Sequence, residues 1–230
     1  MKVDDRTYFT LKRLHSLSGV LPIGGFVLVH FFTNAKSLQG PAHFDKAAQE
    51  LASIPFILLI EAGTIWVPIL FHAVLGMLIA GTSKPNLAHF GYPKNWNYVA
   101  QRASGILLFA FIAYHTWSTR FSQDYLNSAS AYQFMSEHFA HPGVFAFYVV
   151  GVIATGFHLG NGLFGFSIHW GLATGRRAQD VAARIGLAVG VAVSIIGLLS
   201  ILGFRGLRLD FMQKPHSKPH QEVVYQGGQH

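Results

Sequence analysis

Residues 138–175 read HFAHPGVFAFYVVGVIATGFHLGNGLFGFSIHWGLATG and contain no Lys, Arg, Asp or Glu. A transmembrane helix needs about 20 predominantly apolar residues, so this stretch is long enough to cross a bilayer. Four further stretches of similar length lack charge apart from a single carboxylate, Glu61. We therefore predict five transmembrane spans, near residues 15–36, 57–82, 98–120, 142–171 and 182–205.

The overall composition agrees with a membrane protein. The 230-residue chain is 51% hydrophobic and only 12% charged, whereas about a quarter of residues is the usual charged fraction. These values argue against a disordered chain, a typical cytosolic enzyme and a nucleic-acid binder with a basic stripe. The absence of Cys excludes disulfides, thiolate metal sites and iron–sulfur ligands, but 13 His are available to hold a redox metal.

Lys and Arg are distributed unequally between the loops. With the N-terminus inside, ten of them lie in the inner segments and three in the two outer connecting loops. The positive-inside rule therefore predicts a cytoplasmic N-terminus and an extracytoplasmic C-terminus. We expect one domain over residues 1–205, short interfacial helices at 42–54 and 130–139, and a polar, disordered tail over 206–230.

One histidine lies well inside each of the first four predicted spans. They are His30, His72, His115 and His158, at separations of 42, 43 and 43 residues. A helix rises about 1.5 Å per residue, which places His30 level with His115 near the outer surface and His72 level with His158 deeper. Two opposed imidazoles per level suit an octahedral iron whose other ligands come from a porphyrin. We therefore predict an all-α membrane protein whose first four spans form a bundle around two bis-histidine b haems.

Other uses of the four histidines fit the pattern less well. A proton relay needs a chain of Asp, Glu and His side chains along one path, and only one carboxylate lies inside the spans. A zinc or copper transporter needs further neighbouring ligands at one level, such as an HxxxH pair, a carboxylate or a thiolate. A haem-free transporter whose histidines bind metal or protons remains the alternative from a different functional class.

The segments that surround these histidines resemble a known family. KRLHSLSGVLP with VHFF, PILFHAVLG, QRASGILL with YHTW, FHLGNGLFGF, and SIIGLL in the fifth span occur in this order. Over residues 6–205 they are similar to the single-chain, dihaem cytochrome b subunit, of the b558 type, of bacterial succinate:menaquinone oxidoreductases. A dihaem cytochrome b of a hydrogenase, formate dehydrogenase or nitrate reductase is the alternative within the same functional class.

The resemblance implies a subunit in the bacterial cytoplasmic membrane that anchors a flavoprotein subunit and an iron–sulfur subunit on the cytoplasmic side. Electrons from succinate would reach the inner haem, held by His72 and His158, and then the outer haem, held by His30 and His115. The resemblance implies that the final acceptor is a quinone, namely menaquinone. The chain lacks a flavin fingerprint and cluster ligands, so we expect it to be an oxidoreductase subunit that does not itself oxidise succinate. The direction of the reaction and any higher oligomer stay open.

Further candidate residues surround the predicted haems. Gly19, Gly76 and Gly162 share helix faces with the histidines and would leave room for a macrocycle. Five polar residues toward the inner surface are candidates for binding haem propionates or a quinone head group: Arg13, His15, Arg102, Ser104 and His169. Glu61 lies 11 residues before His72 on the same helix face, and we predict that it relays protons to a quinone near the outer haem.

Overall fold

The computed structural model describes residues 4–82 and 92–209, in which every regular element is helical. A first rod runs unbroken through α1 (Asp5–Ser18), η1 (Gly19–Ile23), α2 (Gly24–Asn34) and η2 (Ala35–Gln39). A second comprises α4 (Ile57–Glu61), η3 (Ala62–Trp66) and α5 (Val67–Gly81). The other long helices are α6 (Pro93–Thr116), continued by η4 (Trp117–Phe121), α9 (Pro142–His169) and α10 (Arg176–Phe204). Three short helices are α3 (Pro41–Ala52), α7 (Gln123–Leu126) and α8 (Ala131–Ala140).

Four helical segments of the described chain are long and apolar enough to cross a membrane. They are Asp5–Gln39, Ile57–Gly81, Pro142–His169 and Arg176–Phe204. These four correspond to the first, second, fourth and fifth predicted spans. The predicted span 98–120 falls on α6 and η4, which are more polar because they include Gln101, Arg102 and Arg120. The two short helices expected in the outer loops are present as α3 and α8.

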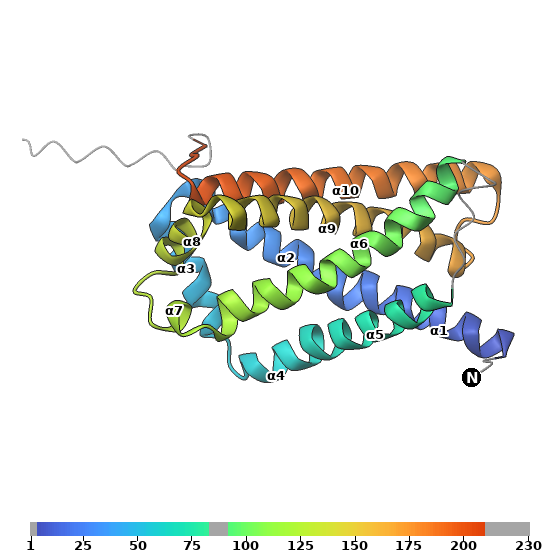
Figure 1. Cartoon of the computed structure of the whole chain (residues 1–230), viewed down its shortest axis with the longest axis horizontal. Coiled ribbons are helices and arrows are strands. Elements are labelled where there is room, and N and C mark those ends of the chain that lie inside the picture. Colours follow the sequence, from blue (N-terminus) through green and yellow to red (C-terminus); the bar gives the residue numbers. More distant parts are fainter. Residues whose placement is uncertain (1–3, 83–91, 210–230) are drawn as a thin grey trace, which may run out of the picture.

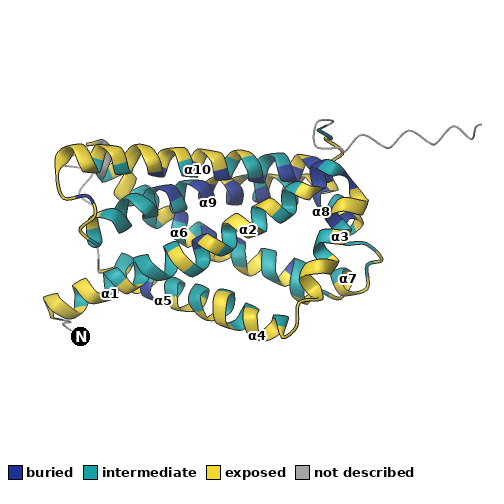
Figure 2. Ribbon diagram, turned by 180° about the vertical axis from the view of Figure 1, so that it is seen from behind, coloured by how far each residue is buried: buried dark blue, intermediate teal, exposed yellow. Residues whose placement is uncertain are grey.

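The long helices lie side by side in one elongated bundle (Figure 1). We call the end where α1 begins the N-terminal end, and the opposite end, where α3, α7 and α8 lie, the cap end. Helix α10 runs along α9 so closely that a Cβ at Gly160 would collide with the backbone carbonyl of Gly186. Small residues are the usual means by which membrane helices approach each other this closely. Buried residues concentrate between α9 and α10 and at the cap end, whereas α4 and α5 are largely exposed (Figure 2).

Three π-helical turns interrupt the long helices, and two of them adjoin prolines. Pro22 lies inside η1, and Pro68 lies in the first turn of α5, directly after η3. Proline has no N–H and its ring clashes with the preceding turn, so the regular α-helical bond pattern cannot continue through it. Such π turns are rare and occur frequently at functional sites. The turn η1 begins at Gly19, which lies directly against His72 of α5.

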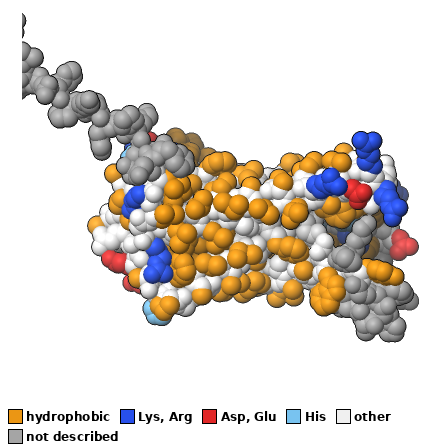
Figure 3. Space-filling model, turned by 90° about the horizontal axis from the view of Figure 1, so that it is seen from above, with side chains coloured by type: hydrophobic (Ala, Val, Ile, Leu, Met, Phe, Trp, Pro, Cys, Tyr) orange, Lys and Arg blue, Asp and Glu red, His pale blue; other side chains and the backbone are white. Residues whose placement is uncertain are grey.

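The surface of the bundle is apolar around its middle. On the face shown in Figure 3, hydrophobic side chains cover the central part, and charged side chains gather toward the two ends. Leu187 is 68% exposed, and Phe32 and Leu70 are each 64% exposed. Large apolar side chains at this exposure are unfavourable in water and are expected where a protein faces lipid.

A compact aromatic core closes the cap end. Phe139 of α8 is 1% exposed, and its ring centre lies 5.8 Å from that of Phe204 at the end of α10. Asp45 of α3 accepts hydrogen bonds from the Ser130 hydroxyl at 2.6 Å and from the Tyr132 N–H at 2.8 Å. This carboxylate therefore joins the two loops of the cap end and supports the first turn of α8.

The chain beyond α10 folds back onto the cap end. The guanidinium of Arg208 donates to the carbonyl of Gly203 at 2.7 Å, to the carbonyl of Ser37 at 3.2 Å and to the Tyr132 hydroxyl at 2.7 Å. The N–H of Leu209 donates to the carbonyl of Leu38 at 3.3 Å. Most of the predicted polar tail, residues 210–230, lies outside the described residues.

Candidate functional site

The four histidines of the long helices meet in two pairs. His72 of α5 faces His158 of α9, with ring centres 6.2 Å apart and ring planes at 80°. His30 of α2 faces His115 of α6, with ring centres 5.7 Å apart and ring planes at 75°. The two histidines of each pair come from different long helices. Each pair also consists of the two histidines that were predicted, from their positions along the helices, to lie at the same depth.

The donor set of each pair fits a haem iron. A metal ion held between two imidazoles lies about 2 Å from each nitrogen, and each nitrogen lies about 1 Å from its ring centre, so the ring centres stand about 6 Å apart. Both pairs have this spacing. Within the described residues no group of three or more His, Cys, Asp or Glu could hold a metal ion. Each pair therefore offers two nitrogen ligands, which suits a porphyrin-bound iron rather than tetrahedral zinc.

A Ser-Gly doublet borders each ring of the His72–His158 pair. The hydroxyl of Ser18 lies 3.2 Å from His72 Nδ1, and the hydroxyl of Ser104 lies 3.1 Å from His158 Nδ1. A Cβ at Gly19 would stand 2.6 Å from Cε1 of His72. With Nδ1 engaged in both rings, Nε2 is the nitrogen left to bind a metal.

The His30–His115 pair has a different partner. The Tyr148 hydroxyl of α9 lies 3.1 Å from His115 Nδ1, and Tyr148 is 4% exposed. Nearby at the cap end, the ring of His138 stacks on Tyr114 with centres 6.0 Å apart and lies 5.7 Å from the Tyr148 ring. Burial lowers the pKa of His138 below its usual value, which favours the neutral form of this side chain.

His15 lies directly against the His72 ring. The two rings are stacked, with centres 3.9 Å apart at 18°, and the His15 carbonyl lies 3.0 Å from His72 Nδ1. Gly76 provides the space for this arrangement, because a Cβ there would stand 2.9 Å from His15 Nε2. At Gly162 a Cβ would meet its nearest neighbour, the amide nitrogen of Gln101, only at 3.7 Å.

The basic residues predicted near the inner surface lie toward the N-terminal end of the bundle. The Arg13 guanidinium stands over the Trp170 ring, 4.2 Å from its centre. Arg13 Nε and His169 Nδ1 are buried and have no hydrogen-bond partner among the described residues. Arg102 instead turns back along its own helix, where it donates to the Tyr98 carbonyl at 3.1 Å. Two polar atoms, one of Arg13 and one of His169, therefore remain available to a bound anionic group such as a haem propionate.

Glu61 belongs to a different cluster, between the second rod and η4. Its carboxylate accepts a hydrogen bond from Arg120 at 2.9 Å. The rings of Trp66 in η3 and Phe121 in η4 also contact each other, with centres 5.9 Å apart. Glu61 directly precedes the π turn η3, and Arg120 lies inside the π turn η4.

Several residues that adjoin the paired histidines were not among the predicted site residues, including Ser18, Gly105 and Tyr148. The first two share a signal with residues that were, because Ser18-Gly19 and Ser104-Gly105 are identical doublets that each precede a paired histidine by the same distance. Tyr148 gives no such signal, since its contact with His115 depends on how α9 is rotated against α6.

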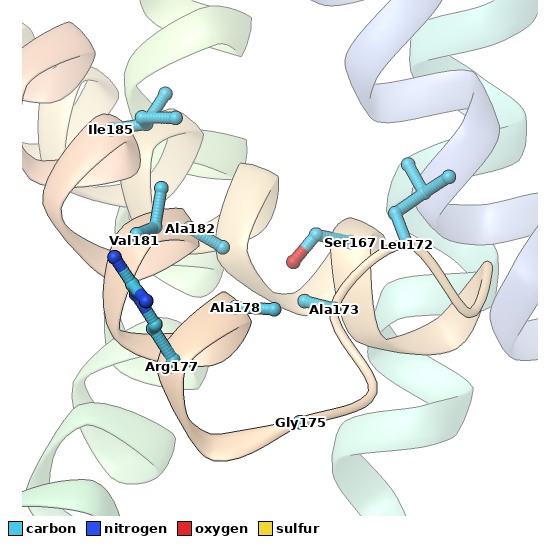
Figure 4. A pocket seen from close by; sticks show the side chains of 9 residues that line it. All are labelled: Ser167, Leu172, Ala173, Gly175, Arg177, Ala178, Val181, Ala182 and Ile185. Atoms are coloured by element: carbon cyan, nitrogen blue, oxygen red, sulfur yellow. The ribbon is translucent and has the colours of Figure 1, made fainter.

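A separate groove opens at the N-terminal end between α9 and α10. Its volume is about 620 Å³, and Figure 4 shows that most side chains lining it are apolar, with Arg177 at its edge. None of the paired histidines lines this groove. The two histidine pairs, not the groove, therefore form the candidate redox site.

Comparison with known proteins identifies related chains. The family model described as succinate dehydrogenase/fumarate reductase transmembrane subunit matches residues 84–199, a range that contains His115 and His158. The succinate dehydrogenase cytochrome b558 subunit of Bacillus subtilis (strain 168) is 36% identical over 196 residues, which cover 85% of this chain and 96% of that protein.

Proposed function

The chain belongs to the family of succinate dehydrogenase/fumarate reductase transmembrane subunits, and we propose on this basis that it anchors a succinate:quinone oxidoreductase in the bacterial cytoplasmic membrane. Its partners are a flavoprotein subunit and an iron–sulfur subunit, and it carries electrons between the iron–sulfur subunit and menaquinone. The described helices contain no Cys for a cluster, which agrees with a role as conduit rather than as the site of succinate oxidation.

The two histidine pairs are the observation that carries this proposal. We assign His72 and His158 to one b haem and His30 and His115 to a second. A haem with both axial positions filled transfers single electrons and offers no open site for oxygen. The chain's own part is to hold the four imidazoles at two levels, so that two redox centres lie along the bundle axis.

Several polar residues support binding of the haem held by the His72–His158 pair. Arg13 and His169 offer buried donors to its propionates, while Ser104 acts on His158 directly. The His15 ring stacks on the His72 ring, and the His15 carbonyl lies within hydrogen-bond distance of His72 Nδ1. Arg102, bonded to its own helix, contributes positive charge at the same end.

We assign α6 with η4 as the remaining membrane span, the third in chain order, which brings the total to five. Its 24 α-helical residues correspond to about 36 Å at about 1.5 Å per residue, enough to cross the hydrocarbon core. The inner position of the N-terminal end follows from its excess of Lys and Arg. Fusing a reporter that is active only outside the cytoplasm to residue 209 tests both points, and activity of this fusion is expected.

Glu61 is proposed to relay protons to a quinone near the cap end, with Arg120 holding its carboxylate in place. Glu61→Gln is expected to slow reduction of a short-chain naphthoquinone while leaving haem content unchanged. Glu50→Gln is the matched control, because Glu50 also pairs with a basic residue, Lys46, but on the exposed face of α3. Unchanged quinone turnover in Glu61→Gln would exclude the relay.

A pyridine haemochrome assay on the purified complex tests the central proposal. Two haems per chain are expected, and replacing any one of the four paired histidines by Ala should remove one haem. The two variants of each pair should lose the same haem, as identified by reduced-minus-oxidised spectra. A haem-free preparation with intact helices would instead indicate a histidine-based transporter, and copurification with other catalytic subunits would indicate another dihaem cytochrome b.

A further inference from the structure

We propose that Ser18 and Ser104 are positioning residues that fix the tautomer of His72 and His158, presenting Nε2 of each ring in its bare, metal-binding form. The inference rests on the proposed function, because it concerns how two ligands of one haem are prepared. Neutral imidazole carries its proton on either nitrogen, and only the unprotonated nitrogen can bind a metal. The partner of Nδ1 therefore decides whether Nε2 is available.

The second partner of each hydroxyl, a backbone carbonyl that can only accept, indicates the direction of each hydrogen bond. Ser18 Oγ lies 2.9 Å from the His15 carbonyl, to which it donates, and 3.2 Å from His72 Nδ1. Ser104 Oγ likewise donates to the Gln101 carbonyl at 3.0 Å. A hydroxyl has a single proton, so once this proton points at the carbonyl the oxygen can only accept from the imidazole. Both rings must then carry their proton on Nδ1.

The same device occurs twice, at equivalent places in the two halves of the bundle. Ser18, Gly19 and His72 correspond to Ser104, Gly105 and His158 with a constant offset of 86 residues. In each half the hydroxyl contacts Nδ1 of the histidine 54 residues later. The following glycine faces Cε1 of the same ring in both halves. The repetition indicates that the serine and the glycine act together to orient one imidazole.

The two copies differ in one respect that makes the inference testable. His72 Nδ1 has a second acceptor, the His15 carbonyl at 3.0 Å. Within the described residues His158 Nδ1 has only the Ser104 hydroxyl. Removing the Ser104 hydroxyl therefore leaves a ring N–H without a partner, whereas removing the Ser18 hydroxyl leaves one acceptor in place. Replacing Ser104 should therefore weaken histidine ligation of the haem more than replacing Ser18.

The expected effect is on the haem itself. A hydrogen-bond acceptor at Nδ1 makes the imidazole a stronger donor to the metal, and loss of such a partner typically lowers metal affinity about 10- to 100-fold. A weaker donor stabilises the ferric state less, so the reduction potential of the haem rises. Ser104→Ala should therefore raise the potential of one haem, or release that haem, while the other haem is unaffected.

The experiment is a redox titration, with haem quantitation, of membranes carrying the full complex. Ser104→Ala should shift one haem more than Ser18→Ala does, and Ser104→Thr, which keeps the hydroxyl, should restore the wild-type value. Ser194→Ala is the matched control, because Ser194 bonds a carbonyl of its own helix, that of Gly190, but contacts no histidine.

Each outcome of this experiment has a defined meaning. If both Ala variants titrate like the wild type, or if Ser104→Thr behaves like Ser104→Ala, the hydroxyl does not position the ring and the inference is overturned. A wild-type complex without haem would overturn the proposed function instead. The two failures are therefore distinguishable.

Discussion

Replacing Gly19 by Ala tests how tightly η1 packs against the His72–His158 pair. The new Cβ would lie 2.6 Å from Cε1 of His72. Non-bonded carbon atoms prefer about 3.5–4.0 Å, so the ring must retreat by about 1 Å. Metal–ligand distances tolerate only about 0.2 Å. We therefore expect Gly19→Ala to lose the haem assigned to His72 and His158 and to keep the haem assigned to the other pair.

Two further variants calibrate this result. At Gly105 the added Cβ would stand 3.1 Å from Cε1 of His158, so the ring needs to move by less than half as much and partial haem loss is expected. At Gly25 nothing lies within 4 Å, and Gly25→Ala should keep both haems. The assay is haem per chain by pyridine haemochrome, with reduced-minus-oxidised spectra to identify the haem. Two haems and an unchanged spectrum in Gly19→Ala would refute the packing argument.

The glycine and serine variants differ in their expected order of severity. Haem loss should be greater for Gly19→Ala than for the Gly105 variant, whereas the effect should be greater for Ser104→Ala than for Ser18→Ala. This difference separates crowding of the ring from loss of its hydrogen bond.

Three other substitutions have defined expectations. Tyr148→Phe leaves His115 Nδ1 without the hydroxyl at 3.1 Å, and an unpaired buried N–H costs about 1–3 kcal/mol. Titrating haem into apoprotein should therefore show about 5- to 150-fold weaker binding of the haem assigned to His30 and His115. Asp45→Ala removes the carboxylate that supports the first turn of α8, which should lower stability by about 1 kcal/mol; an unchanged thermal midpoint of the detergent-solubilised protein would count against this role. Gly160→Ala should destabilise the protein by about 1–3 kcal/mol because it overpacks the α9–α10 contact, whereas Gly165→Ala, with no neighbour within 4 Å, should be neutral or stabilising in the same denaturation assay.

Charge spacing predicted most of the helical architecture because a bilayer admits few charges. The uncharged stretches correspond to α2, α5, α9 and α10, and the helical spacing of the outer loops corresponds to α3 and α8. Two helices begin earlier than predicted, since α1 starts at Asp5 and α10 at Arg176, each ahead of its long apolar stretch. By contrast, α5 and α9 end one and two residues before the predicted ends of their spans. A hydropathy pattern marks where lipid ends, whereas a helix ends only where its backbone bonds do.

The neighbours of the histidines were predictable only in part. Counting residues along helices gives depth, so it can assign His72 and His158 to one level. It does not give helix rotation, on which the contact between Tyr148 and His115 depends. The partner of Glu61 was missed for a related reason, because Arg120 is 59 residues away and only the packing of η3 against η4 brings the two together. Two of the three π turns adjoin prolines, whereas η4 contains none, so neither the prolines nor the apolar periodicity alone predicts where the π turns lie.

The unbroken rod from Asp5 to Gln39 is too long for the membrane it crosses. Its 35 residues span about 52 Å at about 1.5 Å per residue, while the hydrocarbon core is about 30 Å thick. Even at a tilt of about 40°, the upper end of the usual range, the rod would rise about 40 Å along the membrane normal. Roughly two helical turns must therefore project beyond the acyl chains. The first turns of α1, with Asp5 and Arg6, are polar enough to form this projecting part, which would extend from the membrane as a rigid helix.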